Sequence, residues 1–257
     1  LPLIAVPTTA GSGSEQTRAT VIADPAADTK LAIYDDALLP ATAIVDYELS
    51  ITQPRALTAH VGLDALVHAI EAYVSRLATP LSDVLALEAA RLVWPNLRAA
   101  VERPEDRAAR AAMMLGSSLA GAAFSNSSVC LVHGMSRPLG AQFHIEHGLS
   151  NAILLDVVTR FSVPGAPDRY AQFARALDLA PAGASEEAAN EALLSALDEL
   201  VTALEIPTLS SLGVTREALE RVADAMAAAA LASGSPGFNP RQPDHDEIVA
   251  LFREVHR

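Results

Sequence analysis

Asp64 and His68 stand four residues apart in a stretch rich in alanine and leucine. On a helix this spacing puts both side chains on one face, one turn from each other. A carboxylate and an imidazole placed in this way can bind one side of a divalent metal ion. The same spacing is also compatible with a buried hydrogen bond between the two side chains, and the pair alone leaves both interpretations open.

Two further histidines, His133 and His147, lie in a second cluster. His133 stands in an apolar stretch with helical spacing, and His147 follows a short turn before Gly148. Taken singly, each is typical of a histidine in a core or at a helix cap. With Asp64 and His68 they offer one carboxylate and three imidazoles, a set that suits Zn²⁺ or Fe²⁺ and is too rich in nitrogen for Mg²⁺ or Ca²⁺.

Residues 8–15 form a loop of small residues, mainly glycine, serine and threonine, directly after an apolar stretch. Exposed backbone N–H groups and hydroxyls in such a loop can bind a pyrophosphate. The loop has neither a G-x-G-x-x-G pattern nor the lysine of a P-loop, so an ordinary tight loop is an equal interpretation of the pattern alone.

The elements that must position these residues change in type near residue 53. Short apolar or β-branched runs separated by Asp and Pro predict strands at 1–6, 17–23, 31–34 and 43–46. We expect the first of these to be a buried strand that ends at Pro7. Beyond it, helical periodicity predicts helices at 54–76, 81–93, 104–124, 129–139, 150–161, 168–177, 185–204, 215–230 and 244–255. Ser185 and Thr215 are predicted N-caps, and 104–106 is a predicted start led by proline.

Composition excludes several classes of protein. The formal net charge of −13 leaves no basic surface for nucleic acid or an anionic membrane. The single cysteine excludes a disulfide framework within the chain and favours a reducing, cytoplasmic location. No apolar run approaches the roughly 18 residues of a membrane-spanning helix, and no signal peptide is evident. We therefore expect a folded protein that has small molecules as partners.

Three segments, 7–15, 62–73 and 133–152, resemble in this order segments of the iron-containing (group III) alcohol dehydrogenases. The resemblance implies a mainly α protein with an N-terminal α/β piece and the dehydroquinate synthase-like fold. Residues 1–52 would be the C-terminal part of an α/β dinucleotide-binding domain. Residues 53–257 would be an all-helical domain that binds the metal and carries the catalytic site.

The resemblance also implies roles for individual residues. The metal ligands, and through the metal the catalytic residues, would be Asp64, His68, His133 and His147. The cofactor-binding residues would be Thr8, Thr9, Ala10, Gly11, Ser12 and Lys30. Phe124 and Arg137 would line the substrate pocket.

The chain departs from the family pattern in two ways. Family members carry a longer N-terminal half with a glycine-rich turn, and this sequence begins after it. The family also commonly has a second histidine four residues after the ligand that corresponds to His133, where this chain has Arg137. Because arginine is not a base near neutral pH, it cannot take over a proton relay assigned to that histidine. Arg137 either faces the cofactor or an anionic group of the substrate, or lies at a solvated helix end before Pro138.

The resemblance therefore implies a metal-dependent alcohol dehydrogenase that transfers hydride between an alcohol or aldehyde and NAD or NADP. Its metal would be Fe²⁺, with Zn²⁺ as the alternative, and a homodimer is a further expectation. Other hypotheses are an enzyme like the zinc glycerol dehydrogenases or dehydroquinate synthase, and a truncated, catalytically silent metal-binding module. Metal-dependent hydrolysis is disfavoured, because no acidic residue is clearly placed beside the ligands to activate water.

Overall fold

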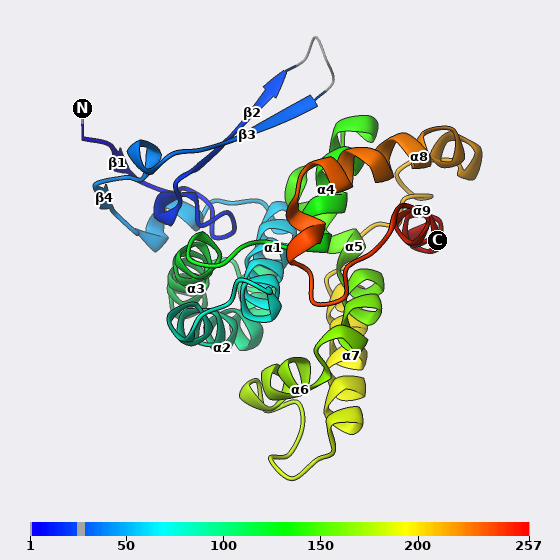
Figure 1. The fold of residues 1–257 in the computed structure, drawn as a ribbon. Coiled ribbons are helices and arrows are strands. Elements are labelled where there is room, and N and C mark those ends of the chain that lie inside the picture. Colours follow the sequence, from blue (N-terminus) through cyan, green and yellow to red (C-terminus); the bar gives the residue numbers. More distant parts are fainter. Residues whose placement is uncertain (1, 25–28, 257) are drawn as a thin grey trace. The chain divides into compact units, whose positions relative to one another are not determined.

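The chain divides into two compact units, which are described separately. The structure, a computed structural model, describes residues 2–24 and 29–256 (Figure 1). The first unit comprises Leu1–Tyr73 and Ala78–Ser128, and the second comprises Val74–Leu77 and Val129–Arg257. The domain boundary predicted between residues 52 and 53 separates the strands from the helices and stays a prediction.

The strands of the first unit form two small pairs. β1 (Ile4–Ala5) runs parallel to β4 (Thr42–Ala43), and β2 (Ala19–Asp24) pairs antiparallel with β3 (Thr29–Tyr34). Short 3₁₀ helices lie between and after the strands: η1 (Ser14–Gln16), η2 (Asp36–Leu38) and η3 (Tyr47–Ser50). All four predicted strand regions therefore contain a strand.

The expected burial of the first strand is wrong. β1 has two residues, and Ile4 is 60% exposed, while Leu3 and Val6 beside it are 50% and 47% exposed. Its only paired neighbour in the described chain is β4. Among the described residues this strand has one hydrogen-bonded edge, and its apolar side chains are exposed there.

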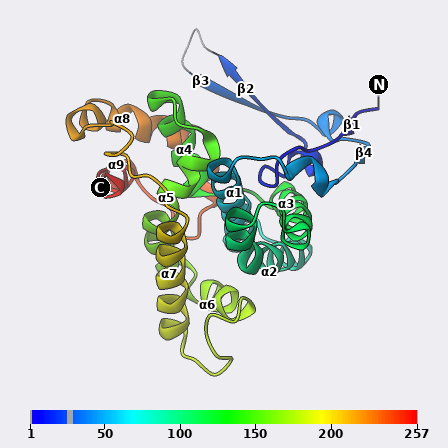
Figure 2. The same ribbon diagram turned by 180° about the vertical axis from the view of Figure 1, so that it is seen from behind.

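Three helices complete the first unit: α1 (Arg55–Val74), α2 (Pro80–Glu102) and α3 (Arg107–Ser125). α2 and α3 pack along each other in both views (Figures 1 and 2). α2 begins at a capping box in which Thr79 and Ser82 satisfy each other's backbone N–H groups. α3 begins after Asp106, whose carboxylate accepts from the Ala109 N–H at 3.1 Å, so the predicted proline-led start lies three residues too early.

The second unit is helical. Its helices are α4 (Leu131–Phe143), α5 (His147–Ser162), α6 (Pro167–Ala176), α7 (Glu186–Ala203), α8 (Arg216–Ala232) and α9 (His245–Val255), with 3₁₀ helices η4 (Val163–Gly165) and η5 (Ser235–Phe238). α4 packs on α5 and α8, and α6 packs on α7. The predicted N-caps of α7 and α8 are confirmed, since Ser185 and Thr215 each accept a backbone N–H of the first turn at 3.1 Å.

Two helices run further than the sequence predicts, and each contains a proline near its predicted end. α2 continues past Pro95 to Glu102, and α4 continues past Pro138 to Phe143. A proline inside a helix removes one backbone hydrogen bond, and the packing of the flanking turns can outweigh this loss. In α2 the Asn96 side chain donates to the Leu92 carbonyl at 2.9 Å, which adds a bond in the affected turn.

Within the described residues, no helix is long and apolar enough to cross a membrane.

Candidate metal centre and cofactor loop

The first pair of candidate ligands lies on α1, in the first unit. Asp64 and His68 are 3% and 4% exposed, and Asp64 Oδ1 lies 3.9 Å from His68 Nδ1. α1 is buried on several faces, as the full burial of Leu63, Leu66 and Val67 beside them shows. Burial of a carboxylate is costly unless it is paired or coordinates a metal. The predicted one-turn spacing is therefore present, in an environment from which water is largely excluded.

His68 is oriented by contacts inside its own unit. Its Nδ1 lies 3.3 Å from the Gly11 carbonyl oxygen, and its ring stacks on Phe124 with centroids 4.4 Å apart and planes at 22°. A ring N–H that donates to the Gly11 carbonyl places the proton on Nδ1 and leaves Nε2 as the ring nitrogen with a free lone pair for a ligand. The stacked phenyl ring also limits rotation of the imidazole.

The loop 8–15 lies against the same helices. An added Cβ on Gly11 would meet Val61 Cβ at 2.5 Å, and Gly13 has a left-handed φ of +56°. The next residues are tied to α3, because Gln16 Nε2 donates to Ser118 Oγ at 3.1 Å. The predicted phosphate-binding loop is thus held close to α1, and Gly11 contributes directly to the orientation of His68.

A buried arginine fixes the start of α1 relative to α3. Arg110 is 1% exposed, its Nη1 donates to Thr58 Oγ1 at 3.0 Å, and its Nε donates to the Pro104 carbonyl at 3.0 Å. Burial lowers the pKa of Arg110 from its ordinary value. Arginine remains charged near neutral pH, so a charged group donates the hydrogen bond that ties α3 to the helix carrying Asp64 and His68.

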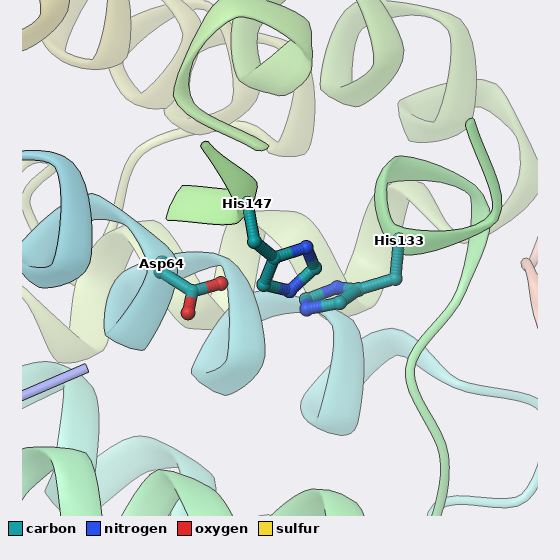
Figure 3. A group of neighbouring side chains, drawn as sticks. All are labelled: Asp64, His133 and His147. Atoms are coloured by element: carbon teal, nitrogen blue, oxygen red, sulfur yellow. The ribbon is translucent and has the colours of Figure 1, made fainter. Parts of the chain in front are cut away.

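The second pair of candidate ligands lies in the second unit. His133 of α4 is 3% exposed, His147 at the start of α5 is half-buried, and their ring centroids are 5.3 Å apart at a tilt of 57°. Figure 3 shows the two tilted rings, together with Asp64 of α1. Asp64, His133 and His147 each offer one atom suited to a metal ion. The turn between the two helices is tight, since His144 adopts a left-handed φ of 53°.

Asn151 links the two imidazoles. It is fully buried on α5, one turn after His147, and its Nδ2 lies 3.2 Å from His133 Nε2 and 3.3 Å from His147 Nε2. The sequence interpretation did not include Asn151. Its position four residues after a candidate ligand on a predicted helix is the signal that could have found it.

The remaining predicted site residues fall in different surroundings. Arg137 lies within α4 and not at a helix end, is half-buried, and donates from Nη1 to Ser235 Oγ at 3.0 Å. Thr8 and Ser12 are exposed, Thr9 is half-buried, and Ala10 is buried. The backbone of Lys30 lies in β3, but its side chain lies outside the described residues. The pairs Asp64–His68 and His133–His147 belong to different units, and each is formed within its own unit.

Comparisons with known proteins place the whole chain in one family. Residues 58–256 match the Fe-containing alcohol dehydrogenase family, C-terminal, and residues 1–47 match iron-containing alcohol dehydrogenase. The chain is 42% identical over 255 residues to the 1-propanol dehydrogenase PduQ of Salmonella typhimurium, which covers 98% of this chain and 69% of the relative. It is 37% identical to an NADPH-dependent butanol dehydrogenase of Clostridium saccharobutylicum, over 98% of this chain and 64% of the relative.

A solved structure agrees with these matches. The crystal structure of a 1,3-propanediol oxidoreductase superposes with a TM-score of 0.93 at 39% identity, covering 99% of this chain and 66% of the other. The chain thus spans about two thirds of the length of these relatives. The chain belongs to the iron-containing alcohol dehydrogenase family and has its dehydroquinate synthase-like fold.

Proposed function

We propose that Asp64, His68, His133 and His147 together hold one divalent metal ion. The observation that carries the proposal is the occurrence, in each unit, of a close pair of candidate ligands, of which all but the half-buried His147 are buried. Each pair alone supplies two ligands, which is too few for a stable transition-metal site. Membership of an iron-containing family supports a shared ion.

The donor chemistry fits Fe²⁺ or Zn²⁺. Three imidazoles and one carboxylate are ligands that both ions accept, and the nitrogen content disfavours Mg²⁺ and Ca²⁺. Asp64 is the one anionic member of the set, so a divalent ion held there would keep a net positive charge. Family membership favours iron.

We propose that the loop 8–15 binds the phosphates of NAD or NADP. Thr8, Thr9, Ala10, Gly11 and Ser12 would contact the dinucleotide, with Lys30 as a further contact. The hydrogen bond between Gly11 and His68 supports the proposal, because it joins the cofactor loop directly to a candidate metal ligand. Hydride transfer requires cofactor and substrate to lie in contact, and this bond couples the positions of the two sites.

The proposed reaction is the reversible oxidation of a small alcohol to an aldehyde or ketone. A bound divalent ion would lower the pKa of the alcohol hydroxyl, and oxidised NAD(P) would accept the hydride from the carbon while the hydroxyl proton leaves to solvent. Asp64 and His68 are buried and held on one face of α1. Phe124, stacked on His68, would present an apolar surface to the carbon chain of the substrate.

The alcohols in the relatives' names are short, which supports a short-chain alcohol or aldehyde as substrate. We also propose a cytoplasmic homodimer with no nucleic-acid partner. The acidic net charge and the single cysteine support the location and the absence of nucleic acid.

The test is NAD(P)H-dependent reduction of short aldehydes by the chain loaded with Fe²⁺ under anaerobic conditions. We expect loss of absorbance at 340 nm with propanal, butanal or 4-oxobutanoate. His147→Ala should abolish it, and His245→Gln, which changes a half-buried histidine of α9 that is not a candidate ligand, should not. If the chain retains the metal but neither binds nor turns over NAD(P)H, the proposal is contradicted. That result would favour the alternative of a catalytically silent metal-binding module.

A further inference from the structure

Arg137, a positively charged residue, stands on α4 one helical turn after a proposed metal ligand. It follows His133 by four residues on α4, so the two side chains start from the same face of the helix, with Cβ atoms about 6 Å apart. Arg137 is half-buried, whereas His133 is 3% exposed. The Arg137 side chain therefore starts one turn from a proposed metal ligand and lies in partly dehydrated surroundings.

The guanidinium group is anchored on one side by a neutral partner. Arg137 Nη1 donates to Ser235 Oγ at 3.0 Å, and Ser235, the first residue of η5, is 4% exposed. η5 lies tight against α4 because Gly134 has no side chain, and an added Cβ there would meet Pro236 Cγ at 2.7 Å. Close packing of α4 and η5 thus fixes the hydroxyl that orients Arg137.

No carboxylate pairs with Arg137 among the residues that the structure describes. Three other arginines of the second unit have carboxylate partners: Arg160 with Asp156 at 3.1 Å, Arg241 with Glu247 at 2.7 Å and Arg253 with Glu220 at 2.8 Å. A guanidinium group carries five N–H donors, and the Ser235 contact uses one of them. The remaining N–H donors of the planar guanidinium group suit a planar or tetrahedral anion.

We propose that Arg137 selects a substrate with an anionic group, namely a short alcohol or aldehyde that carries a carboxylate, sulfonate or phosphate a few carbons from the reacting carbon. The inference rests on the proposed function, since the metal centre beside His133 fixes where the hydroxyl or carbonyl lies. One turn of helix between His133 and Arg137 sets the spacing between the reacting carbon and the anion. Ser235 is a positioning residue that holds the guanidinium for this contact.

A matched substrate pair tests the inference. 4-Oxobutanoate and butanal have the same chain length and differ in the carboxylate. We expect the unmodified chain to have the higher kcat/KM for 4-oxobutanoate. Arg137→Met should lower the ratio of the two kcat/KM values by about 10- to 100-fold, the range for a hydrogen bond to a charged group. Arg137→Lys should recover part of the ratio, and Arg253→Met, which removes an exposed charge elsewhere in the unit, should leave it unchanged.

The second readout is binding, which needs no turnover. 4-Hydroxybutyrate should raise the melting temperature of the metal-loaded chain more than 1-butanol does, and Arg137→Met should remove this difference. An unchanged substrate ratio in Arg137→Met overturns the inference, as does equal stabilisation by both ligands in the unmodified chain. If Arg137→Met instead raises KM for NAD(P)H and leaves the ratio intact, the anion belongs to the dinucleotide, which also overturns it. Absence of turnover with both aldehydes, together with selective binding of 4-hydroxybutyrate, would count against the proposed function and leave the anion site supported.

Discussion

The close approach of Gly121 to Gly13 predicts an unusual effect of a Gly121→Ala substitution. Gly121 lies in α3, and an added Cβ would meet the Gly13 carbonyl oxygen closest of all, then Gly13 C and Cα at 2.8 Å each. All three neighbours are backbone atoms of the proposed cofactor loop, which cannot rotate away as the end of a flexible side chain can. The substitution must therefore displace the loop or the helix.

Two opposing effects decide the sign of the change in stability. Alanine in a helix interior is favoured over glycine by about 1 kcal/mol. Overpacking costs about 1–3 kcal/mol, and backbone neighbours place this case in the upper part of that range. The net expectation is a loss of about 1–2 kcal/mol in the free energy of unfolding, which for a chain of this size lowers the melting temperature by about 2–8 °C.

Thermal unfolding followed by circular dichroism measures this directly. Gly183→Ala is the matched control, because nothing lies within 4 Å of an added Cβ at Gly183, and its melting temperature should stay close to that of the unmodified chain. If the loop did not touch α3, only the helix preference would act and Gly121→Ala would be more stable than the parent. A rise in melting temperature would therefore refute the packing derived for the loop.

Two other substitutions give independent tests. Asn151→Ala should destabilise the metal-free chain more than the metal-loaded chain, by about 1–3 kcal/mol for two lost hydrogen bonds, because Asn151 contacts both imidazoles that a bound metal would otherwise hold. Equal losses in melting temperature in both forms would contradict this. The pKa of His245 is raised by its hydrogen bond to the Asp224 carbonyl and by Asp246. Protonated His245 therefore stabilises the folded chain at pH values below its unfolded-state pKa of about 6.5. This stabilisation is lost as pH rises through the higher folded-state pKa. The melting temperature of His245→Gln should therefore lie furthest below that of the parent at acidic pH, and a gap that widens towards alkaline pH would show the opposite sign.

Local sequence signals predicted most of the helices and the one-turn spacing of Asp64 and His68. Ser185 and Thr215 cap α7 and α8 as expected, because capping is decided within one turn of the chain. The one-turn spacing of Asp64 and His68 likewise follows from helix geometry alone. Such features need no knowledge of which segments meet in the folded chain.

Features that depend on tertiary contact were missed. The proximity of Gly13 and Gly121 joins residues more than a hundred positions apart, and no local pattern indicates it. The roles of Asn151 and Ser235 also depend on neighbouring helices, since each contacts a residue of α4. α2 continues past Pro95 because its flanking turns pack, which a local helix-breaking rule does not consider.

The measurement that tests the account most directly is the metal content of the purified chain, determined by mass spectrometry after reconstitution with Fe²⁺ or Zn²⁺. We predict one ion per chain, which Asp64→Ala loses while keeping its helical circular dichroism. Asp246→Ala is the matched control, because its carboxylate is fully exposed on α9, and it should keep the ion. One ion per chain in Asp64→Ala would contradict the assignment of Asp64 as a ligand and, with it, the proposed metal centre.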